Sequence, residues 1–258
     1  MKLYHIDLSE EMLEGAQIAV VPGDPGRVER IADIIGKSPK RLAFNREYCS
    51  FLTSIEGKNV IICSTGIGGS STSIAVEELA RLGVKVFIRV GTSGSIQEYI
   101  EAGSVVISSG AVRLDGTSYH FAPEQYPAVS DPYIMFHLIK AAKELDIDFH
   151  VGITASSSTF YQGQERYNSY SGHVPRWLQG SREEWRKLNV LNYEMEAATL
   201  FVMCSAMGLQ AGCVCGIIAQ RVKGEDVVKD IKGETVDKTI EVVGRAIADF
   251  IKQPDLFK

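Results

Sequence analysis

The strongest constraint in this sequence is the alternation of short apolar runs with longer amphipathic stretches. Runs rich in β-branched residues predict strands, and apolar residues at helical spacing predict helices. Strands that alternate with helices are typical of a parallel or mixed sheet covered by helices on both faces, so we expect an α/β fold with a central mixed β-sheet. Strands are predicted over residues 18–21, 48–55, 60–64, 84–91, 104–112, 149–155, 191–194 and 212–219, and helices over 25–35, 71–82, 132–145, 182–188, 195–207 and 235–251.

One segment could be mistaken for a membrane span. Residues 197–220 carry no charge, and Gly208, Gly212 and Gly216 recur at a spacing of four. A span needs about 20 apolar residues, and small residues at this spacing also pack helices in bilayers. The glycines and the polar Ser205 and Gln210 favour another interpretation. We expect a helix that ends at Gly208, a turn, and a strand buried on both faces.

Composition and cysteine usage narrow the class of protein. The chain has 258 residues and no linker-like stretch, so one domain spanning residues 1–258 is preferred over two. A net charge of −5 argues against a general nucleic-acid binder, and the first residues contain no apolar signal sequence. Five cysteines without a C-x-x-C pair predict buried free thiols in the reducing cytoplasm.

Three glycine-rich turns are predicted, each after a predicted strand, at residues 22–27, 65–71 and 89–94. Such segments let backbone N–H groups approach an anion, and ligands of open α/β sheets lie beyond the carboxyl ends of the strands. Arg27 and Arg89 sit at two of these segments, and Thr92 adds a hydroxyl. The three together with their arginines indicate a phosphate-sized anion site, although any one of them alone is more often only a tight turn. Neither G-x-G-x-x-G, a P-loop nor a nucleophile elbow is present.

Two further segments carry chemistry. The irregular stretch 156–180 contains Phe160, Gln164 and Arg166, an aromatic with an amide and a guanidinium that could read a ring bearing carbonyls and an N–H. A solvated loop is the alternative. Residues 193–196 place two glutamates at a helix start, where a carboxylate could accept two hydroxyl hydrogen bonds from a sugar diol or could simply compensate the helix dipole.

Taken together, four strings resemble the nucleoside phosphorylase-I family from about Tyr4 to at least Arg221. They are residues 20–25 (VVPGDP), 63–69 (CSTGIGG), 160–167 (FYQGQERY) and 192–196 (NYEME), and the third is typical of the uridine-specific branch. The resemblance implies a three-layer α/β/α sandwich and a hexamer built as a trimer of dimers. It also implies a pentosyltransferase that splits uridine reversibly into uracil and ribose 1-phosphate in pyrimidine salvage, with phosphate as co-substrate and no cofactor.

The resemblance also implies a role for individual residues, with catalysis assigned to Arg89, Gln164 and Arg166. Some relatives hold a monovalent cation, such as potassium, at the dimer interface, and the matching positions here are Glu47, Ile67 and Ser71. Phosphate would be bound by Gly23, Arg27, Arg89, Thr92 and the neighbouring subunit's counterpart of Arg46; ribose by Met195, Glu196 and the neighbour's counterpart of His5; and uracil by Phe160, Gln164, Arg166 and Arg221.

Two residues depart from the family's pattern, and three alternative functions are considered. Ser70 and Gln220 differ from the relatives' proline and asparagine, next to the cation site and the loop that would close over the base. Purine phosphorylases and hydrolytic nucleosidases of the family use an aspartate that residues 218–222 lack. A non-catalytic nucleoside-binding protein is a third alternative, but it would not need the arginines at 27, 46 and 89.

Overall fold

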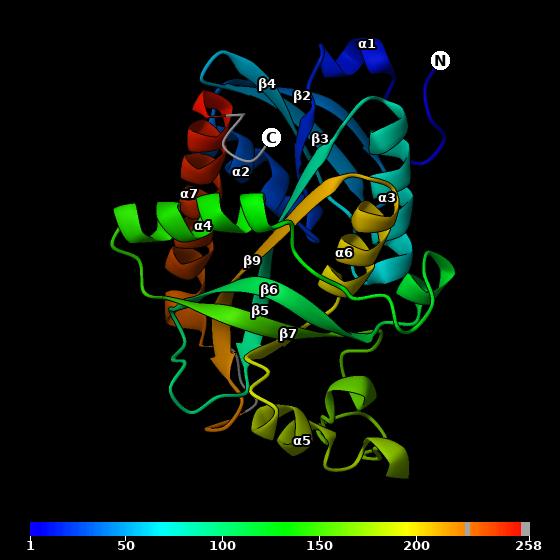
Figure 1. Ribbon diagram of the computed structural model, residues 1–258, viewed down its shortest axis with the longest axis vertical. Helices are drawn as coiled ribbons and strands as arrows, with labels where there is room; N and C mark the ends of the chain where they lie inside the picture. The colour runs from blue at the N-terminus through cyan, green and yellow to red at the C-terminus, as the bar shows by residue number, and fades with distance from the viewer. Residues whose placement is uncertain (225–227, 254–258) are drawn as a thin grey trace.

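A nine-stranded mixed sheet lies at the centre of the computed structural model, which describes residues 1–224 and 228–253 (Figure 1). The strand order is β2-β3-β4-β1-β5-β8-β7-β6-β9. Parallel pairing joins β1 to β4 and β5, whereas β3 is antiparallel to β2 and β4. The strands are β1 Ile18–Val20, β2 Lys37–Asn45, β3 Tyr48–Ile55, β4 Lys58–Cys63, β5 Val86–Ser95, β6 Val105–Leu114, β7 Phe149–Ser157, β8 Asn192–Glu194 and β9 Gln210–Gln220.

Helices cover both faces of this sheet, as the α/β/α prediction requires. Alternate residues of β4 point to opposite faces, so Ile61 packs with α3 and α6 while Ile62 packs with α2, α4 and α7. In Figure 1, α4 and α7 lie on one side of the strands and α3 and α6 on the other. The helices are α1 Glu10–Leu13, α2 Val28–Ile35, α3 Gly69–Arg81, α4 Pro132–Glu144, α5 Ser181–Lys187, α6 Ala197–Ala206 and α7 Lys229–Lys252.

The sheet also curls on itself, which the layered prediction does not anticipate. Strand β5 pairs with β1, β8 and β9, so the strands β5, β8, β7, β6 and β9 form a closed ring. The pairing of β5 with β9 continues to Ser95, four residues past the predicted end of the strand. Residues 89–94 are therefore strand rather than a glycine-rich turn, and that prediction is wrong.

Most predicted elements are present within a few residues of their expected bounds, and β3 matches its prediction at both ends. The uncharged segment divides as expected into α6 and β9, with a positive φ at Gly208 between them. Strand β2 was not predicted. It lies at the sheet edge, most of its residues are exposed, and Pro39 sits where its pairing register shifts, so it lacks the apolar alternation of a covered strand.

The five cysteines are buried and free, in agreement with the prediction. Burial raises the pKa of Cys63 to about 12, so this thiol stays protonated and unreactive. Cys213 and Cys215 point to the same face of β9. Within the described ranges, none of the helices has the length and apolar character needed to cross a bilayer.

Candidate active site

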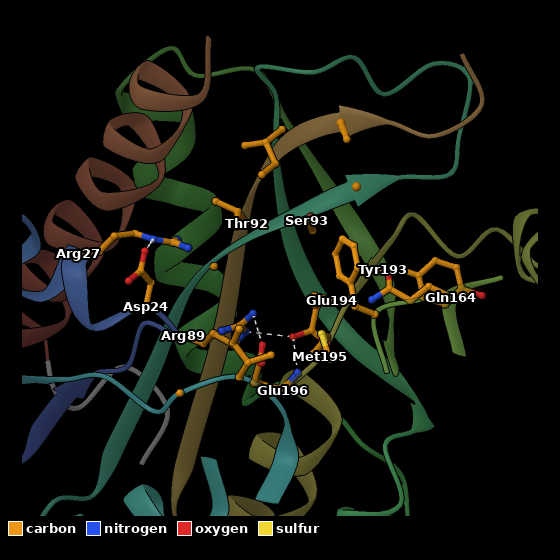
Figure 2. A pocket seen from close by; sticks show the side chains of 18 of the residues that line it. Asp24, Arg27, Arg89, Thr92, Ser93, Gln164, Tyr193, Glu194, Met195 and Glu196 are labelled. Carbon is orange, nitrogen blue, oxygen red and sulfur yellow. Dashed lines mark hydrogen bonds and ion pairs between the residues drawn. The ribbon is translucent and has the colours of Figure 1, made fainter. Parts of the chain in front are cut away.

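A cavity of about 590 Å³ opens where several strands end. Its wall includes residues 23–27 after β1, Gly66 and Ile67 after β4, and the second half of β5. Residues 193–196, between β8 and α6, form another part of the wall, and Phe160, Gln164 and Arg166 complete it. Figure 2 shows Asp24 and Arg27 on one side, Gln164 on the other, and Arg89, Glu194 and Glu196 between them. The structure thus brings together five segments that are separated in sequence.

The four residues predicted to bind phosphate from within one subunit line the same cavity. A Cβ atom placed on Gly23 would lie 3.9 Å from Nη1 of Arg89, so this glycine and this arginine are close neighbours. Arg27 donates from Nε to Asp24 at 3.4 Å, and its buried Nη1 has no hydrogen-bond partner among the described residues. Thr92 is half-buried and directly follows Gly91 on β5. Guanidinium N–H groups of this kind can hold an anion.

Arg89 lies between two buried carboxylates. Its Nε donates to Glu194 at 3.0 Å, and its Nη2 forms an ion pair with Glu196 at 2.5 Å. The three side chains are at most 6% exposed. Gly91 permits this arrangement, because a Cβ atom there would lie 2.8 Å from Nη2 of Arg89.

The two carboxylates differ in how they are held. Glu194 accepts from the backbone N–H of Glu196 and Ala197 at 2.8 and 2.9 Å and from the hydroxyl of Ser156, so it satisfies two backbone donors at the start of α6. Glu196 accepts from the Gly68 N–H at 2.6 Å and from the Met195 backbone, and it forms an ion pair with Arg89. Glu194 has no role among the residues predicted from the sequence. An acid at the last residue of a predicted strand, directly before a helix, is the signal that could have pointed to this role.

Burial and charge act in opposite directions on this cluster. Burial raises the pKa of Glu196 above its ordinary value, Arg89 opposes that rise, and Glu194 adds to it. Burial alone would lower the pKa of Arg89, but the two carboxylates outweigh it and hold that pKa well above its usual range. Arg89 is therefore a permanent cation, whereas the negative charge of Glu196 depends on its partner.

The base-reading candidates form a compact group at the other end of the cavity. Gln164 is 2% exposed, and its side-chain oxygen accepts from Nη2 of Arg166 at 3.5 Å. The Arg166 guanidinium lies 4.2 Å from the centre of the Phe160 ring. Arg221, which does not line the cavity, is buried behind this group and donates from Nη2 to the Gln164 carbonyl at 2.8 Å. Gln220, one of the two departures, accepts from the N–H groups of residues 222 and 223.

Two predicted site residues, His5 and Arg46, do not line the cavity of their own chain. The His5 side chain is 35% exposed, and its Nδ1 lies 2.6 Å from buried Glu78, which also accepts from the His5 backbone N–H at 3.1 Å. Arg46 is exposed beside Tyr4, 5.8 Å from the centre of that ring. Sequence reasoning missed Glu78, because only the tertiary fold brings α3 to the N-terminal segment.

The three candidate cation ligands gather around the turn that follows β4. The Ser71 hydroxyl donates to the Ile67 carbonyl at 3.3 Å. Gly66 adopts a φ of +72°, and a Cβ atom there would lie 2.8 Å from Cγ of Glu47 and 3.0 Å from Oγ of Ser71. A larger residue at 66 would therefore displace both side chains. A carboxylate, a carbonyl and a hydroxyl are oxygen ligands of the type that hard cations prefer.

The fold and the cavity together define a class of protein. It is an α/β protein with one cavity that is lined by arginines, by buried carboxylates and by an aromatic ring beside an amide and a guanidinium. A family model described as the phosphorylase superfamily matches residues 17–253, and the chain belongs to this family. The chain is 50% identical to a uridine phosphorylase of Salmonella typhimurium over 95% of this chain and 96% of that protein. It is 51% identical to a uridine phosphorylase of Haemophilus influenzae over 93% of this chain and 95% of that protein. A guanosine phosphorylase of Halorubrum lacusprofundi is 40% identical over 90% of both chains.

Proposed function

We propose that this chain catalyses the reversible phosphorolysis of uridine to uracil and ribose 1-phosphate. The observation that carries the proposal is one cavity lined by Arg27 and Arg89, by Glu196, and by Gln164 and Arg166. The two arginines at 27 and 89 suit a phosphate. Glu196 suits the ribose diol, and the pair at 164 and 166 suits the edge of the uracil ring. The relatives named uridine phosphorylase cover nearly the whole chain and support the same substrate.

The reaction places opposite charges on the two halves of the nucleoside. A phosphate oxygen forms a bond to C1′ of the ribose while the bond from C1′ to N1 of uracil breaks. The electron pair of the broken bond passes to the uracil ring. Arg27, Arg89 and Thr92 hold the phosphate beside the cationic sugar, and Glu196 with the Met195 backbone holds the ribose hydroxyls. Gln164 and Arg166 donate to the uracil oxygens, where negative charge develops, while Phe160 packs on the ring and Arg221 supports the wall. A proton from solvent then completes the uracil.

The assembly is part of the proposal. We infer that His5 and Arg46 act in a neighbouring subunit's site, since both lie outside the cavity of their own chain. In a hexamer built as a trimer of dimers, His5 would reach the 5′-hydroxyl and Arg46 the phosphate. Mixing inactive His5→Ala/Arg46→Ala subunits with inactive Arg89→Ala subunits should then restore activity in mixed dimers. Absence of recovery after verified subunit exchange would contradict a shared site.

Three smaller proposals accompany it. Residues 1–258 act as a single domain, and the chain works in the cytoplasm, as its free thiols suggest. A potassium ion bound by Glu47, Ile67 and Ser71 would connect the subunits. If so, replacing potassium by a large organic cation should weaken subunit association in wild-type protein but not in a Glu47→Gln variant.

Guanosine is the second candidate substrate, because one relative is named guanosine phosphorylase. A guanine edge presents a carbonyl, an N–H and an amino group, so Arg166 would face a donor where uracil offers an acceptor. Residues 218–222 also contain no acid that could protonate a purine, although Ile218 and Ala219 line the cavity. Uridine therefore fits these residues better.

The function is tested by following base release from uridine and guanosine with and without inorganic phosphate. We expect uracil release that requires phosphate and no useful rate with guanosine. Equal rates for the two nucleosides would remove the base-reading role from Gln164 and Arg166. Undiminished uridine cleavage in phosphate-free buffer would mean that water is the nucleophile and would overturn the proposal.

A further inference from the structure

The ion pair between Arg89 and Glu196 joins two residues that the proposed function gives to different substrates. Arg89 would hold phosphate, and Glu196 would accept hydrogen bonds from the ribose diol. In the structure they hold each other, at 2.5 Å between Nη2 and Oε2, with side chains only 6% and 5% exposed (Figure 2). Water therefore cannot easily replace either partner.

Arg89 can release Glu196 without losing its place. Its Nε remains bonded to Glu194, whose carboxylate is fixed by two backbone N–H groups at the start of α6 and by Ser156. Glu196, in contrast, would lose its charged partner if Nη2 moved to a phosphate and would keep only neutral backbone donors, such as the Gly68 N–H at 2.6 Å. A buried carboxylate that loses a charged partner is costly to leave unpaired. Hydroxyl groups of a ribose can take the place of that partner.

We propose that phosphate and the nucleoside bind with positive cooperativity, because each takes one member of the Arg89–Glu196 ion pair. A ligand that binds alone must break or share the ion pair, and this cost weakens its own binding. The second ligand then finds its residue already released, so each tightens the binding of the other by the same factor. The coupling rests on the proposed function, since it needs a phosphate and a diol in the same cavity.

The test measures the dissociation constant of inorganic phosphate by calorimetry under three conditions: alone, with saturating uracil, and with saturating pseudouridine. Pseudouridine carries the ribose diol and a carbonyl–NH–carbonyl edge, but its carbon–carbon link to the base cannot be phosphorolysed. Pseudouridine should tighten phosphate binding roughly 5- to 150-fold, the usual range for coupled sites. Uracil should leave it unchanged, because it has no diol.

A second arm needs no nucleoside. Glu196→Gln removes the charge that competes for Arg89, so phosphate alone should bind about tenfold tighter than to the wild-type protein, and pseudouridine should tighten it no further. Glu29→Gln is the matched control: it removes one negative charge from the first turn of α2, two residues after Arg27, but in the described part of the chain the ion pairs of Arg89 are with Glu194 and Glu196. Its effect on phosphate affinity should be clearly smaller.

The outcomes separate the inference from the function. If wild-type protein cleaves uridine with phosphate but pseudouridine leaves the phosphate constant unchanged, the coupling is refuted while the function stands. Equal tightening by Glu196→Gln and Glu29→Gln would show a general charge effect and would also refute it. If uridine is not cleaved at all, the proposed function itself fails.

Discussion

Gly91 is the position where the smallest change should most disturb the phosphate end of the cavity. An alanine Cβ there would lie 2.7 Å from Sγ of Cys215 and 2.8 Å from Nη2 of Arg89. Ordinary contacts between carbon atoms are about 3.5–4.0 Å, so something must move by about 1 Å. Cys215 is buried on the paired strand β9, and Arg89 is held by two carboxylates. Overpacking of this kind costs about 1–3 kcal/mol.

The expected result of Gly91→Ala is therefore a double effect. The free energy of unfolding should fall by that amount, which lowers Tm by roughly 2–4 °C for each kcal/mol. A displacement of about 1 Å in a positioning group can reduce the rate by about 10²-fold, so kcat/KM for phosphate should fall about 10- to 100-fold. Gly233→Ala is the control, because a Cβ on this exposed helical glycine meets nothing within 4 Å; it should be neutral or slightly stabilising.

A compensating change distinguishes the two contacts at this position. Adding Cys215→Ala to Gly91→Ala removes the sulfur, so Tm should recover. Activity should recover less, because the new methyl group still presses on Arg89. Steady-state kinetics with varied phosphate, at a temperature well below Tm, measure the second effect. A folded Gly91→Ala protein with unchanged kcat/KM for phosphate would refute the assignment of Arg89 to phosphate.

Two further predictions concern the base and the pH dependence of stability. Cytidine reverses the donor and acceptor pattern that Gln164 and Arg166 match, so its kcat/KM should fall roughly 10⁴-fold below that of uridine; comparable values in a competition assay would contradict this base-reading role. Burial alone would raise the pKa of Asp249, but hydrogen bonds from Lys140 and His137 hold it below its ordinary value. The stability gained from this carboxylate is present above its unfolded pKa of about 3.9 and is lost as pH falls through the lower folded pKa. Asp249→Asn should thus lower Tm at pH 7 and converge with wild type near pH 2; a constant difference in Tm at every pH would indicate lost packing instead.

The elements that bury an apolar face could be predicted from the sequence. The exposed edge strand and the strand pairing that closes the ring could not. Strand β3 and the division of residues 197–220 follow from local apolar runs and from Gly208. Edge strand β2 is too polar to show a pattern. The extension of β5 to Ser95 depends on its long pairing with β9, and a contact between distant segments leaves no local signal.

In the candidate active site, too, some features could be predicted from the sequence and others could not. Arg27, Gln164 and Glu196 could be named because each lies in a short string with a readable chemistry. The ion pairs of Arg89 could not be predicted, because Glu194 and Glu196 reach Arg89 only when β8 pairs beside β5; Glu194 lies 105 residues from Arg89 along the chain. The ion pair that underlies the proposed coupling is thus a property of the tertiary structure.

The central claim is that phosphate, held by these arginines, is the group that attacks the sugar. The most direct measurement follows uridine and inorganic phosphate with the protein by ³¹P NMR while uracil release is monitored. The account predicts that inorganic phosphate disappears and a sugar 1-phosphate forms in equal amount to the uracil. Uracil release with free ribose as the product and an unchanged phosphate signal would contradict it.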